Sequence, residues 1–131
     1  MFLDASAIVA MMTGEADADT LADRLERAPT RFTSGIAVFE TVAAVARKNS
    51  FSIDEARDLV ARFLAICDVT IRPVDALASQ EALRAFERFG KGRHPASLNM
   101  GDCFAYGMAK ALDLPLLFKG DDFPQTDIVA A

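Results

Sequence analysis

Short strand-like segments alternate with helical segments along the whole chain, and this alternation restricts the possible folds more than any other feature. The expected strands span residues 2–4, 31–33, 69–74 and 114–118, with a last edge strand at 127–129. The expected helices span residues 5–12, 17–27, 35–48, 53–67, 76–89 and 100–112. Strands that alternate with helices are typical of an α/β fold with a mainly parallel sheet and right-handed crossovers.

Several helix starts carry their own local signal. Residues 52–55, Ser-Ile-Asp-Glu, have the spacing of a capping box, and Ser34, Asp75 and Asn99 each stand where an N-cap is expected. The glycines, charges and proline of residues 90–95 predict an exposed loop between two helices. The chain has no repeat, linker or low-complexity tract, and it is long enough to bury one core. We therefore expect a single domain over residues 1–131.

Acidic residues stand directly beside apolar runs at four places in the chain. They are Asp4 in Phe-Leu-Asp-Ala, Glu40 in Val-Phe-Glu-Thr, Asp102 in Met-Gly-Asp-Cys, and the adjacent pair Asp121 and Asp122 before a phenylalanine. Burial of an unpaired carboxylate is costly, so each of these positions needs a physical reason. Several carboxylates that meet in one cleft would need a cation.

The topology of a parallel sheet can bring some of these acids together. Ligands of such sheets bind outside the carboxyl ends of the strands. Asp4 ends the first expected strand and Asp121 follows the strand at 114–118, so both belong to that edge. Asp102 lies in the first turn of a helix, and Glu40 lies inside a helix, so only the tertiary fold can bring Glu40 to the same place.

Each acid also has a plain structural interpretation. Asp4 can cap the first helix, Asp102 can complement a helix dipole, and Asp121 and Asp122 can be turn residues. Glu40 fits such an interpretation least well, because residues 36–45 around it are apolar on nearly all sides of the expected helix. A helix of that kind is expected to be buried, and a lone glutamate there needs a partner.

The repulsion between carboxylates decides what a shared site would hold. Two ionised carboxylates about 5 Å apart repel by roughly 3 kcal/mol at an effective dielectric constant of about 20. Three or four must therefore bind protons or a hard cation, and an oxygen-only ligand set suits Mg²⁺ or Mn²⁺. Zinc is disfavoured, because the single histidine, His94, lies in the expected loop and Cys67 and Cys103 lack ligand spacing.

Composition limits the possible partners and compartments. The net charge of −5 and the pI of about 4.8 argue against broad, nonspecific binding to nucleic acid, although they permit a local basic groove. No apolar stretch has the length of a membrane span, and the first apolar run has no basic segment before it, so we expect neither a membrane anchor nor a signal peptide. The two cysteines do not form a disulfide pattern, which favours a reducing cytoplasm.

Three segments together resemble a known family. They are Leu-Asp-Ala-Ser near the N-terminus, Arg-His-Pro-Ala-Ser-Leu-Asn-Met-Gly-Asp-Cys-Phe-Ala-Tyr-Gly-Met-Ala, and Leu-Leu-Phe-Lys-Gly-Asp-Asp-Phe-Pro-Gln-Thr-Asp-Ile, with a helical glutamate at position 40. In this order they resemble the PIN-domain ribonucleases, and specifically the VapC-type toxins of bacterial toxin–antitoxin pairs. The resemblance covers essentially the whole chain, and the second and third segments are the more specific ones.

The resemblance implies a three-layer α/β/α sandwich with a mainly parallel sheet, and a ribonuclease that uses Mg²⁺ or Mn²⁺ to activate water against an RNA phosphodiester. It assigns the metal-binding acids to Asp4, Glu40 and Asp102, and a fourth to Asp121 or Asp122. It also implies a homodimer and a VapB-type antitoxin partner. Contacts to substrate are expected from the following polar and basic residues: Ser6, Lys91, Arg93, Asn99 and Lys119.

Two alternatives remain open at this point. A phosphoacceptor receiver domain is also small, α/β and acidic, with a lysine near its last strands. It fits less well, because Asp4 has no acidic neighbour and the only aspartate after a central strand is Asp75. A PIN domain that binds without catalysis is the other alternative, and the presence of all the expected acids argues against it without proving turnover.

Overall fold

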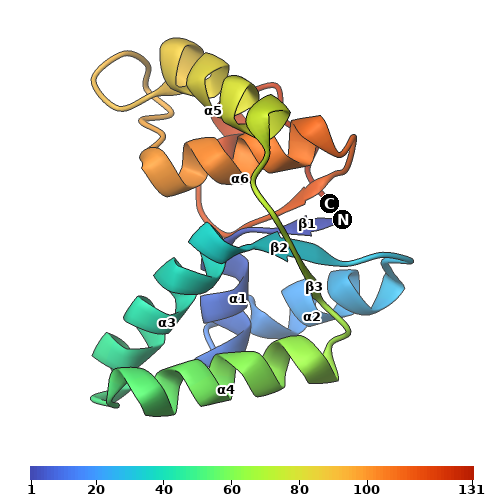
Figure 1. The fold of residues 1–131 in the computed structure, drawn as a ribbon, viewed down its shortest axis with the longest axis vertical. Helices are drawn as coiled ribbons and strands as arrows, with labels where there is room; N and C mark the ends of the chain where they lie inside the picture. The colour runs from blue at the N-terminus through green and yellow to red at the C-terminus, as the bar shows by residue number, and fades with distance from the viewer.

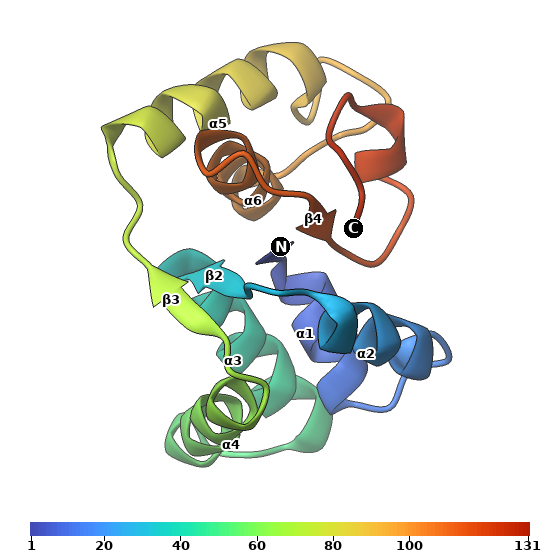
Figure 2. The ribbon, with the colours of Figure 1, turned by 90° about the vertical axis from the view of Figure 1, so that its right-hand side faces the viewer.

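The computed structural model describes residues 1–131 and has three layers, with helices on both faces of a central sheet (Figure 1, Figure 2). The strands are β1 (Phe2–Leu3), β2 (Phe32–Ser34), β3 (Thr70–Arg72) and β4 (Leu116–Leu117). The helices are α1 (Ala5–Met12), α2 (Ala18–Arg27), α3 (Gly35–Asn49), α4 (Ile53–Ile66), α5 (Ala76–Phe89) and α6 (Met100–Ala111), with a 3₁₀ turn η1 (Phe123–Gln125) near the end. Helices α5 and α6 cover one face and α1 to α4 cover the other, so the α/β/α sandwich is confirmed.

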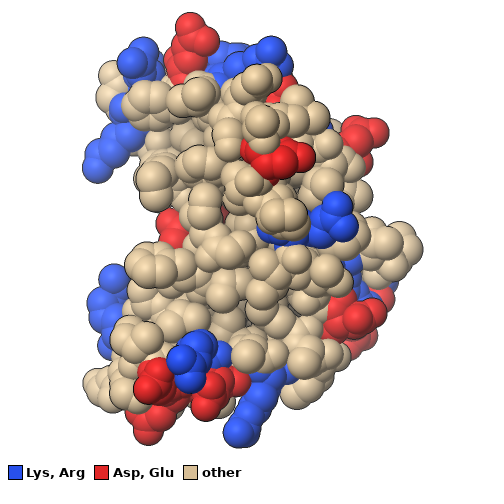
Figure 3. All heavy atoms as spheres, viewed as in Figure 1, with Lys and Arg blue, Asp and Glu red and all other residues tan.

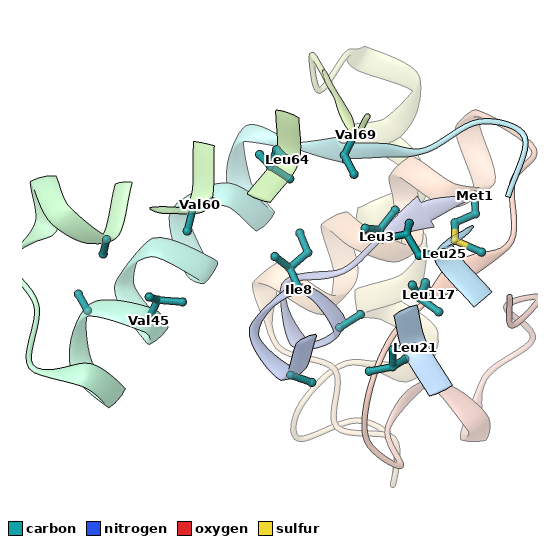
Figure 4. Close-up of a cluster of buried hydrophobic side chains, with 14 residues drawn as sticks. Met1, Leu3, Ile8, Leu21, Leu25, Val45, Val60, Leu64, Val69 and Leu117 are labelled. Carbon is teal, nitrogen blue, oxygen red and sulfur yellow. The ribbon is translucent and has the colours of Figure 1, made fainter. Parts of the chain in front are cut away.

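All strand pairs are parallel, in the order β3-β2-β1-β4. Strands β1 and β4 are short, yet each contributes to both cores because successive side chains point to opposite faces. Phe2 and Leu116 pack with α5 and α6, whereas Leu3 and Leu117 pack with α1 to α4. Figure 4 shows the second of these cores, in which Leu3 and Leu117 lie near Leu21 and Leu25.

The strand order places a topological switch point beside β1. From β1 the chain continues to β2 on one side and returns later to β4 on the other, so the segments that leave β1 and β4 diverge. A crevice forms at such a point, outside the carboxyl ends of the strands. Asp4 follows β1 directly, and Lys119 and Gly120 follow shortly after β4.

The structure corrects two expectations about individual elements. The expected edge strand at 127–129 is only an isolated parallel bridge between Leu116 and Ala130. Helix α3 is not apolar and buried all round: Phe39 is 74% exposed, and the buried side is formed by residues such as Thr41 and Val45. The side of α3 that carries Phe39 therefore faces solvent in the monomer.

The expected helix starts at Ser34, Ser52, Asp75 and Asn99 are confirmed as N-caps. The capping box of residues 52–55 is also complete. None of the helices is both long enough and apolar enough to cross a membrane.

Candidate active site

Asp4, Glu40 and Asp102 line one cleft of about 520 Å³, although they come from three separate elements. Asp4 lies between β1 and α1, Glu40 is in the second turn of α3, and Asp102 is in the first turn of α6. In the space-filling view the molecule is hollowed between α6 and α3, and acidic atoms are visible in the recess (Figure 3). The fold thus brings together three acids that are far apart in sequence.

Asp4 is held rigidly at the base of the cleft. It is only 3% exposed, and its Oδ2 accepts hydrogen bonds from the Ser6 backbone N–H at 2.9 Å and the Ser6 hydroxyl at 2.5 Å. The Ser6 hydroxyl in turn accepts a hydrogen bond from the Lys119 backbone N–H at 3.0 Å. The N-cap of α1 and the segment after β4 therefore position the Asp4 carboxylate together.

Asp102 is oriented by the start of its own helix. Its Oδ2 accepts a hydrogen bond from the Asn99 backbone N–H at 2.9 Å, and the Asn99 side chain accepts one from the Asp102 N–H at 3.0 Å. This reciprocal pair is a capping box, which fixes the carboxylate relative to the helix axis. The capping role and a role in the cleft are compatible, because Asp102 has a second carboxylate oxygen.

Glu40 lies in the space left by a glycine of α6, Gly101, next to Asp102 in the sequence. A methyl group on Gly101 would lie only 2.0 Å from Glu40 Oε1 and 2.3 Å from Oε2, which no real contact allows. The Glu40 carboxylate therefore lies directly against the backbone of α6, and only glycine permits it there. Glu40 is half-buried and accepts no hydrogen bond from any side chain or backbone group.

The three carboxylates disturb one another electrostatically. Burial, followed by the charges of Asp4 and Asp102, raises the pKa of Glu40 to about 7. Burial also raises the pKa of Asp102 to about 6, with Asp4 and Asp122 adding repulsion and the Asn99 N–H opposing it. Burial raises the pKa of Asp4 as well, against its hydrogen bonds from Ser6. None of the three carboxylates forms an ion pair with a lysine or arginine of the chain.

The donor chemistry of the trio fits a hard divalent cation, because all of its ligand atoms are carboxylate oxygens. The three carboxylates do not have the geometry of a metal site in this structure. No three Asp, Glu, His or Cys side chains lie close enough together to bind one ion. The Glu40 side chain accepts no hydrogen bond, so it can rotate toward a bound ion without breaking one.

Sequence comparison decides the family. Residues 1–129 match the PIN domain family. The chain belongs to the PIN-domain family. It is 41% identical to "Ribonuclease VapC" of Mycolicibacterium smegmatis over 130 residues, which cover 99% of this chain and 98% of that protein. It is 40% identical to a VapC ribonuclease of Rhizobium meliloti over 139 residues, covering 97% of this chain and 98% of the relative.

Solved structures show the same PIN fold. Mycobacterium tuberculosis VapC20, described as a sarcin-ricin loop cleaving toxin, superposes with a TM-score of 0.75 at 17% identity, covering 99% of this chain and 97% of that one. A toxin–antitoxin complex from Klebsiella pneumoniae superposes with a TM-score of 0.70 at 16% identity, covering 99% and 95%. A receiver domain is not favoured by these likenesses, and Asp75, its expected phosphoacceptor, caps α5 outside the cleft of this PIN domain.

The adjacent acids after β4 differ in their relation to this PIN-domain cleft. Asp121 and Asp122 are both exposed, and neither lines the cleft. Only Asp122 contributes to the raised pKa of Asp102. Asp122 is therefore electrostatically nearer to the trio, and it is the better candidate for a fourth acid.

The expected substrate contacts divide into two groups. Ser6, Asn99 and Lys119 line the cleft, but the Ser6 hydroxyl is already bonded to Asp4 and to the Lys119 backbone. Lys91 and Arg93 do not line it: Lys91 borders an apolar groove between α5 and α6, and the Arg93 guanidinium lies 5.0 Å from the centre of the Phe86 ring. His94 contacts the Phe89 ring edge-on at 5.3 Å and has a packing role.

Sequence reasoning missed three charged residues of the cleft, namely Glu15, Arg47 and Lys48. The helical period contains a signal for two of them, because Arg47 and Lys48 follow Glu40 by seven and eight positions and so share its side of α3. Glu15 follows α1 in a loop, and no local pattern predicts its position.

Proposed function

We propose that this PIN domain is a Mg²⁺- or Mn²⁺-dependent endoribonuclease and acts as the toxin of a VapBC-type pair. The observation that carries the proposal is the trio of Asp4, Glu40 and Asp102, which line one cleft and form no ion pair with any lysine or arginine of the chain. The names of its relatives, ribonucleases at about 40% identity over nearly the whole chain, support the choice of RNA as substrate.

In the proposed mechanism, Asp4 and Asp102 would hold the ion, with Asp122 as the candidate fourth acid. A bound divalent ion would lower the pKa of water and stabilise charge on the phosphate and on the leaving oxygen. Glu40 contributes a carboxylate that accepts no hydrogen bond from the chain and is therefore available as a proton acceptor. It would accept a proton from the attacking water as the new oxygen–phosphorus bond forms and the bond to the leaving oxygen breaks.

We also propose an antitoxin and a second copy of the chain as protein partners, acting in the cytoplasm. One of the superposing structures is itself a toxin–antitoxin complex. The monomer leaves a groove of about 470 Å³ between α5 and α6, lined mainly by apolar residues that include Leu83, Phe86 and Met100. An exposed groove lined by apolar side chains is a feature of many protein interfaces. Both cysteines are free thiols, in keeping with a reducing compartment.

The activity is tested with purified protein, a single-stranded RNA and a structured RNA, each with Mg²⁺, Mn²⁺ or a chelator. Cleavage is expected only with metal, and Asp4→Asn and Asp102→Asn should each lower it by at least about 100-fold, since each removes a charged ligand at the ion. Asparagine is as good an N-cap as aspartate, so Asp4→Asn keeps the start of α1.

Asp75→Asn is the matched control, because Asp75 also caps a helix but lies outside the cleft. It should cleave RNA at the wild-type rate. Full cleavage by Asp4→Asn or Asp102→Asn would exclude the trio as the catalytic site. Intact RNA binding without cleavage in every metal would instead favour a PIN domain that only binds.

A further inference from the structure

The acidic cleft has a second wall of opposite charge. Arg47 and Lys48, from the last turn of α3, and Lys119, from the segment after β4, line the same cleft as the acidic trio. None of these three cations forms an ion pair with Asp4, Glu40 or Asp102. One side of the cleft thus suits a cation and the other suits an anion.

Glu15 occupies the basic wall in the absence of any ligand. Its Oε1 pairs with the Lys48 ammonium and its Oε2 pairs with the Lys119 ammonium, so a single carboxylate bridges two lysines. These two partners lower the pKa of Glu15 to about 2. Lys119 also pairs with Asp17 at 2.9 Å. Arg47 forms no ion pair and no hydrogen bond with the rest of the chain, and its side chain is exposed.

We propose that Arg47, Lys48 and Lys119 form a binding site for RNA backbone phosphate, and that Glu15 is an internal substitute for that phosphate which the substrate displaces. The proposal rests on RNA as the substrate of the proposed function. A carboxylate that bridges two ammonium groups presents two oxygens in the manner of a phosphodiester, and ion pairs at an exposed site are weak enough to exchange.

This arrangement explains how a chain of net charge −5 can bind a polyanion. Without substrate, Glu15 keeps the two lysines extended toward the cleft. When RNA is bound, its phosphates would add the charge that these cations accept, while the divalent ion offsets the acids on the other wall. The purely structural alternative is that Glu15 only ties the loop after α1 to α3 and β4, with Arg47 and Lys48 complementing the helix dipole.

RNA-binding measurements distinguish the phosphate site from the purely structural role of Glu15. They are made in a chelator, so that metal-dependent cleavage does not remove the RNA. Binding of a short single-stranded RNA is measured by fluorescence anisotropy over a range of salt concentrations. Arg47→Gln should weaken binding about 3- to 10-fold and reduce the slope of log K against log salt by about 0.7, the value of one lost phosphate contact. Arg62→Gln is the matched control: Arg62 is an exposed, unpaired arginine on α4 outside the cleft.

Glu15→Gln gives the opposite change and is the decisive variant. It frees Lys48 from its carboxylate and leaves Lys119 paired only with Asp17. RNA should therefore bind about 3- to 10-fold more tightly, with a steeper salt dependence. Lys48→Gln should weaken binding as Arg47→Gln does. Equal binding by Glu15→Gln and wild type, or equal effects of Arg47→Gln and Arg62→Gln, would overturn the proposal. Thermal unfolding of each variant reports separately on a structural role of Glu15.

Failure of the proposed ribonuclease function and failure of the phosphate site give different results. If the protein binds RNA with these charge effects but cleaves none with any metal, the phosphate site stands and the catalytic proposal fails. If cleavage requires Asp4 and Asp102 but is indifferent to Arg47 and Glu15 in both affinity and rate, the catalytic proposal stands and the phosphate site fails.

Discussion

A single glycine allows Glu40 to lie against the backbone of α6. The Glu40 carboxylate occupies the position that a Cβ at 101 would take, so this placement of the carboxylate requires that residue 101 has no Cβ. Gly101 is otherwise an unfavourable choice inside a helix, where it costs roughly 0.5 to 1 kcal/mol relative to alanine. Its presence in the first turn of α6 is therefore explained by the cleft and not by the helix.

Gly101→Ala is expected to lower RNA cleavage without lowering the stability of the fold. The added methyl overlaps the Glu40 carboxylate, which must rotate away, so metal-dependent RNA cleavage should fall by at least about 10-fold. The free energy of unfolding should stay equal or rise by up to about 1 kcal/mol, because alanine favours the helix. Chemical denaturation and a cleavage assay on the same sample check both parts.

Gly107→Ala in the same helix is the control. A methyl there would meet the Ala78 carbonyl oxygen at 2.4 Å and the Ala82 nitrogen at 2.7 Å, both backbone atoms of α5 that cannot rotate away. This variant should lose about 1 to 3 kcal/mol of stability by overpacking. If Gly101→Ala instead retained full activity, the Glu40 position would be irrelevant to catalysis.

Residue types alone could predict the acids but not their contacts. Asp4 was predictable because it ends a strand, and a strand end in a parallel sheet has a known place. The contact between Glu40 and Gly101 was not predictable, because it depends on the angle at which α3 and α6 pack, and these helices are distant in sequence. Arg47 and Lys48 could have been found from the helical period once Glu40 was taken as the reference.

At the scale of elements, helix starts carry both structure and function. Asp4 is the N-cap of α1, and Asp102 is the third residue of α6 in a capping box with Asn99. A helix start offers backbone N–H groups that bond one carboxylate oxygen and leave the other available. The structural and functional interpretations of these acids are therefore both compatible with the geometry.

Asn99→Ala tests this double role in α6. Loss of the Asn99 side chain removes the acceptor of the Asp102 backbone N–H and should cost about 1 kcal/mol of stability. The backbone N–H of residue 99 still bonds the Asp102 carboxylate, but it does so from a helix start that has lost its cap. Asp102 should therefore be held less firmly, and cleavage should fall by more than the stability loss explains. Asn99→Ser keeps a good cap and should retain most of both. Unfolding curves together with cleavage rates distinguish the variants, and equal activity of the two would argue against positioning by Asn99.

The elements themselves were largely predictable, and their exceptions have a physical cause. Helices that begin with a capping residue were placed well, since the cap is a local interaction. Strand lengths were overestimated: residues 69–74 and 114–118 contain only β3 and β4. A strand ends where the neighbouring strand no longer provides backbone groups for hydrogen bonding. The sequence of the strand itself does not contain that information. The expected strand at 127–129 was wrong for the same reason.

At the scale of the whole molecule, the cleft separates two halves with independent cores. One core packs α1 to α4 against the sheet and the other packs α5 and α6, with Glu40 on the first half and Asp102 on the second. Repulsion between these carboxylates acts across the boundary between the halves. The stability of the metal-free protein should therefore depend on their ionisation.

The direction of that pH dependence follows from the pKa of Glu40. Its folded value of about 7 lies above the ordinary value of 4.5, so between these pH values the folded state binds more protons than the unfolded state. This stabilisation is complete below about pH 4.5 and is lost as the pH rises through about 7. The shift of Asp102 to about 6 acts in the same direction. Glu15 acts in the opposite sense but only between about pH 2 and 4.5.

In chelator, the free energy of unfolding is expected to fall by about 1 to 2 kcal/mol between pH 5 and pH 7.5, after allowance for the solvent screening of a half-exposed carboxylate. Mg²⁺ should reverse this loss, and its stabilising effect should grow with pH because the ligands must be deprotonated. Denaturation at several pH values, with and without Mg²⁺, measures both. Glu40→Gln should flatten the metal-free profile, whereas Glu87→Gln, an exposed change on α5, should leave it unchanged. A wild-type profile in Glu40→Gln would mean that the trio is not coupled across the cleft, and the case for a cation between the two halves would fail with it.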